Sequence, residues 1–480
     1  MSNSLHRSFV CVMVGIFDIN SCRRINICPS LCPVNDSTTQ LRASTKHERV
    51  TSDKGTGVLT HDSMTEGQSC EGQSCEGRGF DMSEKESIKG DTRMQYREDK
   101  ISGNQLSALG LGCMRFPRDK AETERMVLSA IESGVNFFDT AYVYPNSEVT
   151  LGGILAKHGK RKDVFITTKL PISMCRSADD FDKIFGEQLK RLKTDYIDYY
   201  LLHNISDYTD WEKLQKLGFE QWVTDKKKTG QIRRIGFSFH GTCDIFLQIL
   251  NAYTWECCMI QYNYSDENYQ AGKKGLLAAA EKRIPVLIME PLLGGTLATD
   301  LPKKAVDLFS GLNPVLTPAD WGLWWLWNHE EVTVVLSGMS STQILENNVK
   351  SAADYRALTD NELAVYSDVI DVFRESYKVN CTGCNYCLPC PKGINIPACF
   401  SAYNISFSQG YVKGLTLHIT STAGATRNPK SPRLCNECGK CEKACPQNLP
   451  IRKDLKKVAR KFEHIPMRMV LALVRSLMTR

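Results

Sequence analysis

From Met94 onward, strand-like and helix-like segments alternate regularly along the chain. Short apolar runs are separated by longer segments in which apolar residues recur at the spacing of one helix face. Eight strands are expected, at residues 108–113, 135–139, 164–168, 196–202, 232–237, 257–262, 284–289 and 332–337. This alternation predicts an α/β fold, a (β/α)8 TIM barrel. A Rossmann domain is the weaker alternative, because no Gly-x-Gly-x-x-Gly motif follows a first strand.

Three of the intervening helices have predicted boundaries. The sequence Ser-Ala-Asp-Asp at 177–180 predicts a capping box ahead of a one-sided apolar stripe. Gly134 is expected to close a helix over 121–133. Pro318 opens a third helix, which carries four tryptophans between residues 321 and 327. We expect these indoles to pack in the core.

Residues 1–93 differ from the rest, because they are rich in Ser, Thr, Gly and charge and contain little to bury. They are predicted to be a disordered or misassigned N-terminal extension, with Met94 as the start of the folded chain. The apolar run 9–17 is too short to span a bilayer. It resembles a signal peptide only weakly, since Asp18 ends it and no small-residue cleavage site follows. The early cysteines fit no common metal site and are expected to be free thiols: Cys22, Cys28 and Cys32.

Charge and cysteine content narrow the class of protein. A net charge of +6 over 480 residues is modest and gives no case for a nucleic-acid partner. The chain has 20 cysteines, and eight of those after residue 380 stand in Cys-x-x-Cys arrays. In a reducing cell this spacing indicates metal or cluster ligation more often than disulfides. We therefore expect a cytoplasmic protein without a transmembrane segment.

Polar residues stand at the ends of three successive predicted strands. Asp139 and Tyr144 follow the second strand, Lys169 the third and His203 the fourth. Individually each has an ordinary interpretation: Lys169 as a surface residue and His203 as a satisfied core histidine. In a TIM barrel, however, the carboxyl ends of the strands meet at one mouth, so the four side chains are expected to converge.

These residue types fit the reduction of a carbonyl. A carbonyl that receives hydride needs a proton on its oxygen, which Tyr144 can donate. The Lys169 ammonium is expected to lower the pKa of this phenol, and Asp139 to fix the lysine. His203 can orient and polarise the carbonyl.

Residues 94 to about 355 resemble the aldo-keto reductases, specifically the branch with a C-terminal ferredoxin-like domain. The matching segments are Leu-Gly-Leu-Gly-Cys-Met-Arg (109–115), Phe-Asp-Thr-Ala-x-x-Tyr (138–144), Thr-Thr-Lys (167–169), Tyr-Leu-Leu-His (200–203), Ile-Gly-Phe-Ser (235–238), Gln-Tyr-Asn (261–263), Glu-Pro-Leu (290–292) and Glu-Asn (346–347). The resemblance implies that the catalytic tetrad is Asp139, Tyr144, Lys169 and His203. It also implies a nicotinamide cofactor lying across the barrel mouth.

By the same resemblance, four residues contact this cofactor. Ser238 and Gln261 match the residues that hold the nicotinamide carboxamide, and Glu346 and Asn347 match those that reach the adenine.

Three departures from the family pattern concern the cofactor. Met289 stands where an aromatic residue usually stacks on the nicotinamide, and Phe239 where an asparagine is frequent. Ser337 and Gln343 stand where many members carry a lysine and an arginine for the 2′-phosphate. The choice between NADPH and NADH therefore stays open.

The cysteines near the C-terminus form two runs. The second is the bacterial ferredoxin run and the first is one residue shorter, so two [4Fe-4S] clusters are predicted. Because the fourth cysteine of each run binds the other cluster in two-cluster ferredoxins, the expected ligand sets cross over. The first set is Cys381, Cys384, Cys387 and Cys445, and the second is Cys435, Cys438, Cys441 and Cys390. Zinc is the alternative, and Cys399 is a spare thiol.

The predicted organisation has four parts. The extension 1–93 precedes a barrel at 94–375, a ferredoxin-like iron–sulfur domain at 376–450 and a basic helical tail at 451–480. The tail is expected to be a solvated face packed on one side against the barrel. Alternatives are a docking surface for an acidic electron carrier, such as a ferredoxin or flavodoxin, and a membrane-surface helix.

Together these features predict an oxidoreductase that transfers hydride between a nicotinamide cofactor and a small carbonyl substrate, with clusters relaying electrons to or from an external carrier. The alternative is an iron–sulfur electron-transfer protein whose barrel no longer reduces carbonyls.

Overall fold

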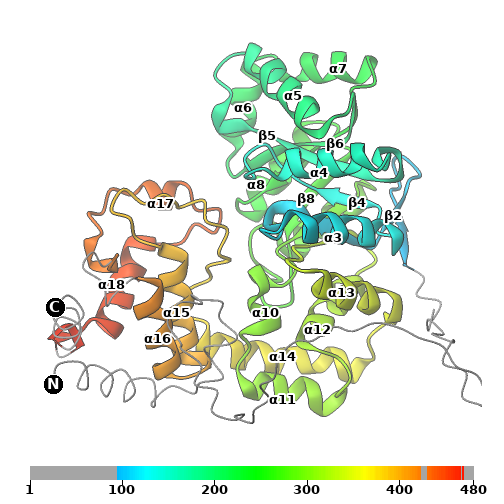
Figure 1. Cartoon of the computed structure of the whole chain (residues 1–480). Coiled ribbons are helices and arrows are strands. Elements are labelled where there is room, and N and C mark those ends of the chain that lie inside the picture. Colours follow the sequence, from blue (N-terminus) through cyan, green and yellow to red (C-terminus); the bar gives the residue numbers. More distant parts are fainter. Residues whose placement is uncertain (1–93, 423–429, 466, 470–480) are drawn as a thin grey trace, which may run out of the picture. The chain divides into compact units, whose positions relative to one another are not determined.

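The computed structural model describes residues 94–422, 430–465 and 467–469 (Figure 1). The predictions for the extension 1–93, including its three cysteines, and for the tail after residue 469 lie outside these ranges.

Eight parallel strands close into a barrel, as predicted, with β10 pairing with both β9 and β3. The strands are β3 Leu109–Gly112, β4 Phe137–Asp139, β5 Phe165–Pro171, β6 Ile197–Ile205, β7 Ile232–Phe239, β8 Cys257–Gln261, β9 Val286–Met289 and β10 Val332–Ser337. Strands β5, β6 and β7 continue past their predicted ends, because they pair with one another as far as Pro171↔His203 and Ile205↔Phe239. Lys169 and His203 therefore lie within strands rather than after them.

A short antiparallel hairpin, β1 (Tyr96–Glu98) with β2 (Gln105–Ser107), precedes the barrel and was not predicted. Its strands are too short to show a period of two in the sequence. Leu106 is fully buried and belongs to the cluster of side chains that fills the barrel interior. The hairpin thus contributes to the inner core.

Helices alternate with the strands (Figure 1). They are α3 Lys120–Glu132, α4 Ser147–Lys157, α5 Asp179–Leu192, α6 Tyr208–Lys216, α7 Phe219–Lys228, α8 Cys243–Ala252, α9 Gly272–Glu281, α10 Thr296–Thr299, α11 Lys303–Leu312, α12 Pro318–Trp327, α13 Thr342–Asp354 and α14 Asp360–Ser376.

Two of the three predicted helix boundaries are confirmed. Gly134, at φ 86°, follows the last residues of α3, and its N–H donates to the Ile131 carbonyl. Pro318 opens α12, and the tryptophans of that helix are buried. The capping box before α5 is only half formed. The Asp180 carboxylate accepts from the backbone N–H of Ser177, but Ser177 does not cap the helix in return.

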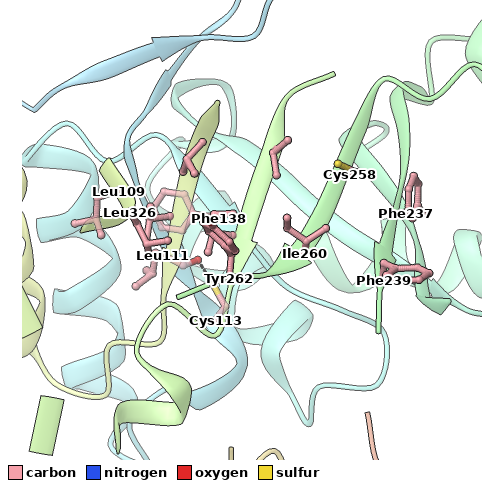
Figure 2. Packing of buried hydrophobic residues seen from close by; sticks show 14 of the residues in the cluster. Leu109, Leu111, Cys113, Phe138, Phe237, Phe239, Cys258, Ile260, Tyr262 and Leu326 are labelled. Atoms are coloured by element: carbon pink, nitrogen blue, oxygen red, sulfur yellow. Dashed lines mark hydrogen bonds between the residues drawn. The ribbon is translucent and has the colours of Figure 1, made fainter. Parts of the chain in front are cut away.

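Side chains alternate between the two faces of the barrel strands. Figure 2 shows residues of the larger cluster, such as Leu109 and Leu111 of β3 and Cys258 and Ile260 of β8. They contribute to the same core as the buried tryptophans of α12. The intervening residues fill the barrel interior: Phe137, Tyr199, Leu201, Cys257, Met259, Leu287, Val334 and Leu336. This two-sided burial explains why the strands read as nearly continuous apolar runs.

Two adjacent glycines in α4 give a matched test of the packing. A Cβ on Gly152 would lie 2.4 Å from the Cα of Leu192, whereas a Cβ on Gly153 meets nothing within 4 Å. We expect Gly152→Ala to lower the free energy of unfolding by about 1–3 kcal/mol, because backbone must move. Gly153→Ala should raise it by roughly 0.5–1 kcal/mol, since alanine favours the helix. Urea denaturation measures both, and equal effects would contradict the α4–α5 contact.

After α14 the chain forms a second core around the cysteine runs. It contains α15 (Ile396–Ser408), α16 (Tyr411–Ser421), the short α17 (Lys440–Lys443) and α18 (Ile451–Phe462). The apolar face of α18 packs with α15 in a cluster that the cysteines adjoin. The sequence had predicted that this face would pack against the barrel instead. Cys399 is fully buried in that cluster, consistent with a spare thiol. Among the described helices, none has the length and apolar character needed to cross a membrane.

Candidate functional site

A cavity of about 780 Å³ opens at the carboxyl ends of the barrel strands, where TIM barrels place their chemistry. All four residues of the predicted tetrad line it. Asp139 ends β4, Lys169 lies in β5 and His203 in β6, and Tyr144 lies in the turn before α4. The barrel thus brings together four side chains that are far apart in the sequence.

Lys169 and Asp139 form the buried ion pair that the sequence predicted. The Lys169 Nζ lies 2.5 Å from the Asp139 Oδ1 and donates a second hydrogen bond to the Thr140 carbonyl at 2.8 Å. The Lys169 side chain is 1% exposed. Burial raises the pKa of Asp139, and the Lys169 ammonium opposes that rise. The pair therefore holds the lysine in a single position on the cavity wall.

Tyr144 contacts two other members of the tetrad through its ring. The Lys169 Nζ lies 5.0 Å from the ring centroid, and the His203 ring packs edge-on at 5.9 Å between centroids. Burial, and then the neighbouring Tyr386 and Asp139, raise the pKa of Tyr144 well above its ordinary value. The prediction of a lowered pKa for this phenol is wrong in direction, because its burial outweighs the effect of the nearby Lys169 ammonium. The phenol is therefore protonated at neutral pH and can act as a proton donor.

His203 is neutral in this environment. Burial lowers its pKa well below the ordinary range, and the nearby Lys169 and His240 add to the effect. Burial likewise lowers the pKa of His240 to about 4. A neutral imidazole can donate one hydrogen bond to a carbonyl oxygen without holding a second positive charge beside Lys169.

The second core supplies one wall of the cavity. Cys384, Tyr386, Pro446 and Gln447 line it together with the tetrad. We call these four residues the roof. Hydrogen bonds join the two parts of the chain around the cavity. Arg115 donates to the carbonyl oxygens of Gly294 at 3.1 Å and Thr382 at 3.0 Å, and Tyr269 donates to that of Gln447 at 2.7 Å.

Tyr386 makes the most direct contact with the tetrad. Its hydroxyl oxygen lies 3.2 Å from the His203 Nε2, and Tyr144 is a near neighbour. Sequence reasoning missed this residue. It stands inside a cysteine run, where no periodicity or spacing distinguishes an aromatic residue that faces a different domain.

Of the predicted cofactor residues, Ser238 lines the cavity and Gln261 does not. The Ser238 Oγ accepts from the Asn204 N–H at 2.8 Å. The side chain of Gln261 is occupied at both ends. Its Nε2 donates to Asp266 at 2.8 Å, and its Oε1 accepts from the Gln447 Nε2 at 2.7 Å. The roof thus holds the glutamine that the resemblance assigned to the nicotinamide carboxamide.

The predicted adenine contacts lie on α13, where both side chains are exposed. Asn347 lines the cavity, while Glu346 does not. Met289 and Ser337, two of the departures from the family pattern, also line it, but the Ser337 hydroxyl already accepts from Asn348 at 2.9 Å. The volume and the mixed lining suit a nicotinamide dinucleotide, whose sites are large and mostly apolar with a few polar groups.

The eight cysteines of the two runs lie in two neighbouring groups, and their assignment to two crossed ligand sets stays a prediction. Burial raises the pKa of the Cys387 thiol to about 12, and the adjacent thiols of Cys381, Cys384 and Cys445 add to the rise. Members of the first set therefore neighbour one another. The second set lines a separate cavity of about 130 Å³, which Cys387 also borders: Cys390, Cys435, Cys438 and Cys441.

The cysteines can also be compared with the needs of a single metal ion and of a cluster. In the described ranges, no three or more His, Cys, Asp or Glu side chains are placed to hold a single metal ion. Four thiols spread around a cavity match the four irons of a cubane, each of which takes one thiolate.

Three of the six basic residues of α18 form ion pairs within the domain. Arg452 binds Glu442, Lys456 binds Glu437 and Lys457 binds Asp454, each at 2.7 Å. A docking surface for an acidic carrier, the alternative raised for the tail, thus has fewer free charges than the sequence suggested.

Comparison with protein-family models gives two matches. The model described as "Aldo/keto reductase family" matches residues 108–370, and that described as "4Fe-4S dicluster domain" matches residues 380–450.

Comparisons with individual proteins also find relatives of the chain. An aldo-keto reductase of Mycolicibacterium vanbaalenii is 36% identical over 144 residues, which cover 28% of this chain and 47% of that protein. An aldo-keto reductase of Schizosaccharomyces pombe whose name specifies NADP(+) is 23% identical over 293 residues, covering 52% of this chain and 84% of that protein. The methylglyoxal reductase DkgB of Salmonella typhi is 35% identical over 136 residues, covering 28% and 48%. The chain thus spans about half the length of the first of these relatives.

Among solved structures, an aldo-keto reductase from Bacillus halodurans in its holo form is 23% identical with a TM-score of 0.49, covering 57% of this chain and 96% of that one.

Proposed function

Because the chain belongs to the aldo/keto reductase family, we propose that it transfers hydride between a nicotinamide cofactor, NADPH or NADH, and a small carbonyl substrate or the corresponding alcohol. A 4Fe-4S dicluster domain follows the barrel. We further propose that two [4Fe-4S] clusters in it relay electrons to or from an external carrier, a ferredoxin or flavodoxin. We propose that the boundary between the barrel and the iron–sulfur domain lies after residue 375, and α14 ends at Ser376.

One observation carries this proposal: the tetrad and a cysteine of the first run, Cys384, line the same cavity. Hydride transfer moves two electrons as a pair and needs no cluster. A cluster ligand on the wall of the site that holds the tetrad therefore favours an exchange of single electrons at that place.

In the reduction, the nicotinamide would supply the hydride when bound. The protein would supply the proton and would hold the carbonyl of the substrate in position. Tyr144, protonated at neutral pH, would donate to the carbonyl oxygen, and the neutral His203 would hold that oxygen with a second hydrogen bond. Lys169, fixed by Asp139, would stabilise the negative charge that develops beside it. Ser238 is the assigned carboxamide residue that faces the cavity.

We assign the two clusters to the crossed cysteine sets, Cys381, Cys384, Cys387 and Cys445 for the first and Cys390, Cys435, Cys438 and Cys441 for the second. The clusters would supply one-electron chemistry when bound. The first set adjoins the cavity through Cys384, and the second includes the exposed Cys438, which suits exchange with a carrier.

A second candidate function is electron transfer by the clusters alone, with a barrel that no longer reduces carbonyls. Two contacts favour it. The Tyr386 hydroxyl contacts His203, and the Gln447 side chain donates a hydrogen bond to the Gln261 side chain. Both place roof residues where cofactor or substrate would be held.

Anaerobic addition of NADPH or NADH to the purified holoprotein separates the two candidates. We expect the nicotinamide band to fall on addition of an aldehyde, and the cluster bands to bleach when the clusters accept electrons. The cofactor that reacts faster is the physiological one. Cluster bleaching by dithionite, with no reaction of either nicotinamide in the presence of aldehydes, would favour the second candidate.

A further inference from the structure

The Tyr386 hydroxyl lies between the two groups assigned to bind the substrate oxygen. It is 3.2 Å from the His203 Nε2, and its ring packs at 73° to the imidazole with 6.3 Å between centroids. Tyr144, whose own ring lies edge-on to His203, is also a near neighbour of this hydroxyl. One oxygen atom thus lies beside both the assigned proton donor and the assigned orienting histidine.

A reacting carbonyl oxygen would lie beside the same two groups. A carbonyl in the active position accepts one hydrogen bond from the tyrosine and one from the histidine. A phenol oxygen has lone pairs to accept from the same two groups. Tyr386 and a reacting carbonyl therefore cannot be bound at this position together.

We propose that Tyr386 occupies the carbonyl-oxygen position and that a substrate must displace it, which makes Tyr386 a specificity-determining residue of this reductase. The inference rests on the proposed function, because it takes Tyr144 and His203 as the groups that bind the substrate oxygen. Tyr386 lies two residues after Cys384 and one before Cys387. When a substrate displaces it, the Tyr386 side chain must therefore take a new position within the first cysteine run.

The proposal predicts a change in KM that is the same for different aldehydes. When a binding-competent state is only partly populated, the apparent affinity falls by that fraction whichever ligand binds. Removing the Tyr386 hydroxyl, and with it the hydrogen bond to His203, should lower KM by up to about tenfold, since such a bond contributes a modest amount to stability. The kcat should stay the same, because Tyr386 has left the site before the chemical step.

The variants are Tyr386→Phe, which removes the hydroxyl alone, and Tyr386→Ala, which also empties the position of the ring. Tyr377→Phe is the matched control, because that hydroxyl donates to the Cys381 carbonyl at 2.9 Å on the same segment. The reconstituted proteins are assayed anaerobically with butyraldehyde and 4-nitrobenzaldehyde. We expect KM to fall by a similar factor for both aldehydes in both Tyr386 variants and to stay unchanged in Tyr377→Phe.

A lower kcat with an unchanged or higher KM in Tyr386→Phe would overturn the proposal, because the phenol would then assist the reaction. Calorimetric titration with benzamide, an unreactive carbonyl compound, tests displacement without turnover. If the wild type reduces no aldehyde, the proposed function fails. Tighter binding of benzamide to Tyr386→Phe would still support displacement in that case, and equal binding to both proteins would refute it.

Discussion

Replacement of Tyr144 by phenylalanine is expected to lower carbonyl reduction by about two orders of magnitude or more, because a positioned proton donor contributes that much to the rate. Nicotinamide binding should change little, since the ring remains over Lys169. The rate is measured from the nicotinamide absorbance under anaerobic conditions, with a saturating aldehyde. The raised pKa of Tyr144 adds a pH criterion. Loss of reduction through ionisation of this phenol should occur only above about pH 10, the ordinary range of tyrosine.

Tyr142→Phe is the matched control for this variant. Tyr142 lies two residues earlier, and the Arg191 guanidinium stacks on its ring at 4.2 Å, while its side chain does not line the cavity. It should retain wild-type turnover. If Tyr144→Phe also retains it on a good aldehyde, then Tyr144 is not the acid of this reaction.

Replacement of Cys438 by serine should separate the two proposed electron paths. Cys438 is the exposed member of the second cysteine set. Loss of one ligand should remove or alter that cluster, so reduction driven by a ferredoxin or a viologen dye should fall strongly. Nicotinamide-linked aldehyde reduction should survive, because the tetrad is untouched. Both activities are measured anaerobically, after circular dichroism has shown that the fold is retained.

Cys243→Ser serves as the control, since Cys243 begins α8 of the barrel and belongs to neither run. It should affect neither activity. If the two activities fall together in Cys438→Ser, or if neither depends on cluster content, the electron-relay proposal is wrong and a structural role for the cluster is preferred.

The barrel could be predicted from the sequence because its strands are short, apolar and regularly spaced. The convergence of Asp139 and His203 followed from that architecture, since all parallel strands end at one mouth. The direction of the Tyr144 pKa did not follow. The residue types indicated a lysine near a phenol. The direction of the phenol's pKa, however, depends on its burial and on the pairing of the Lys169 ammonium with Asp139.

Contacts between the two parts of the chain could not be predicted in the same way. The crossed cysteine sets follow from spacing within a local motif and stay a prediction, with Cys381, Cys384 and Cys445 near Cys387. Tyr386 and Gln447 meet the barrel through side chains that no periodic pattern marks. The resemblance is based on the barrel alone. It therefore assigned Gln261 to the nicotinamide carboxamide without taking account of Gln447, which hydrogen-bonds to that glutamine.

The roof of the cavity also has a consequence for the order in which the protein is made. The strands of the barrel end at Ser337, and α14 ends at Ser376, before any residue of the roof. Domains generally fold as units during synthesis, with N-terminal parts first. The newly translated barrel therefore has its mouth open to water, and the mouth is closed only after the residues up to Gln447 have left the ribosome and folded around their cysteines.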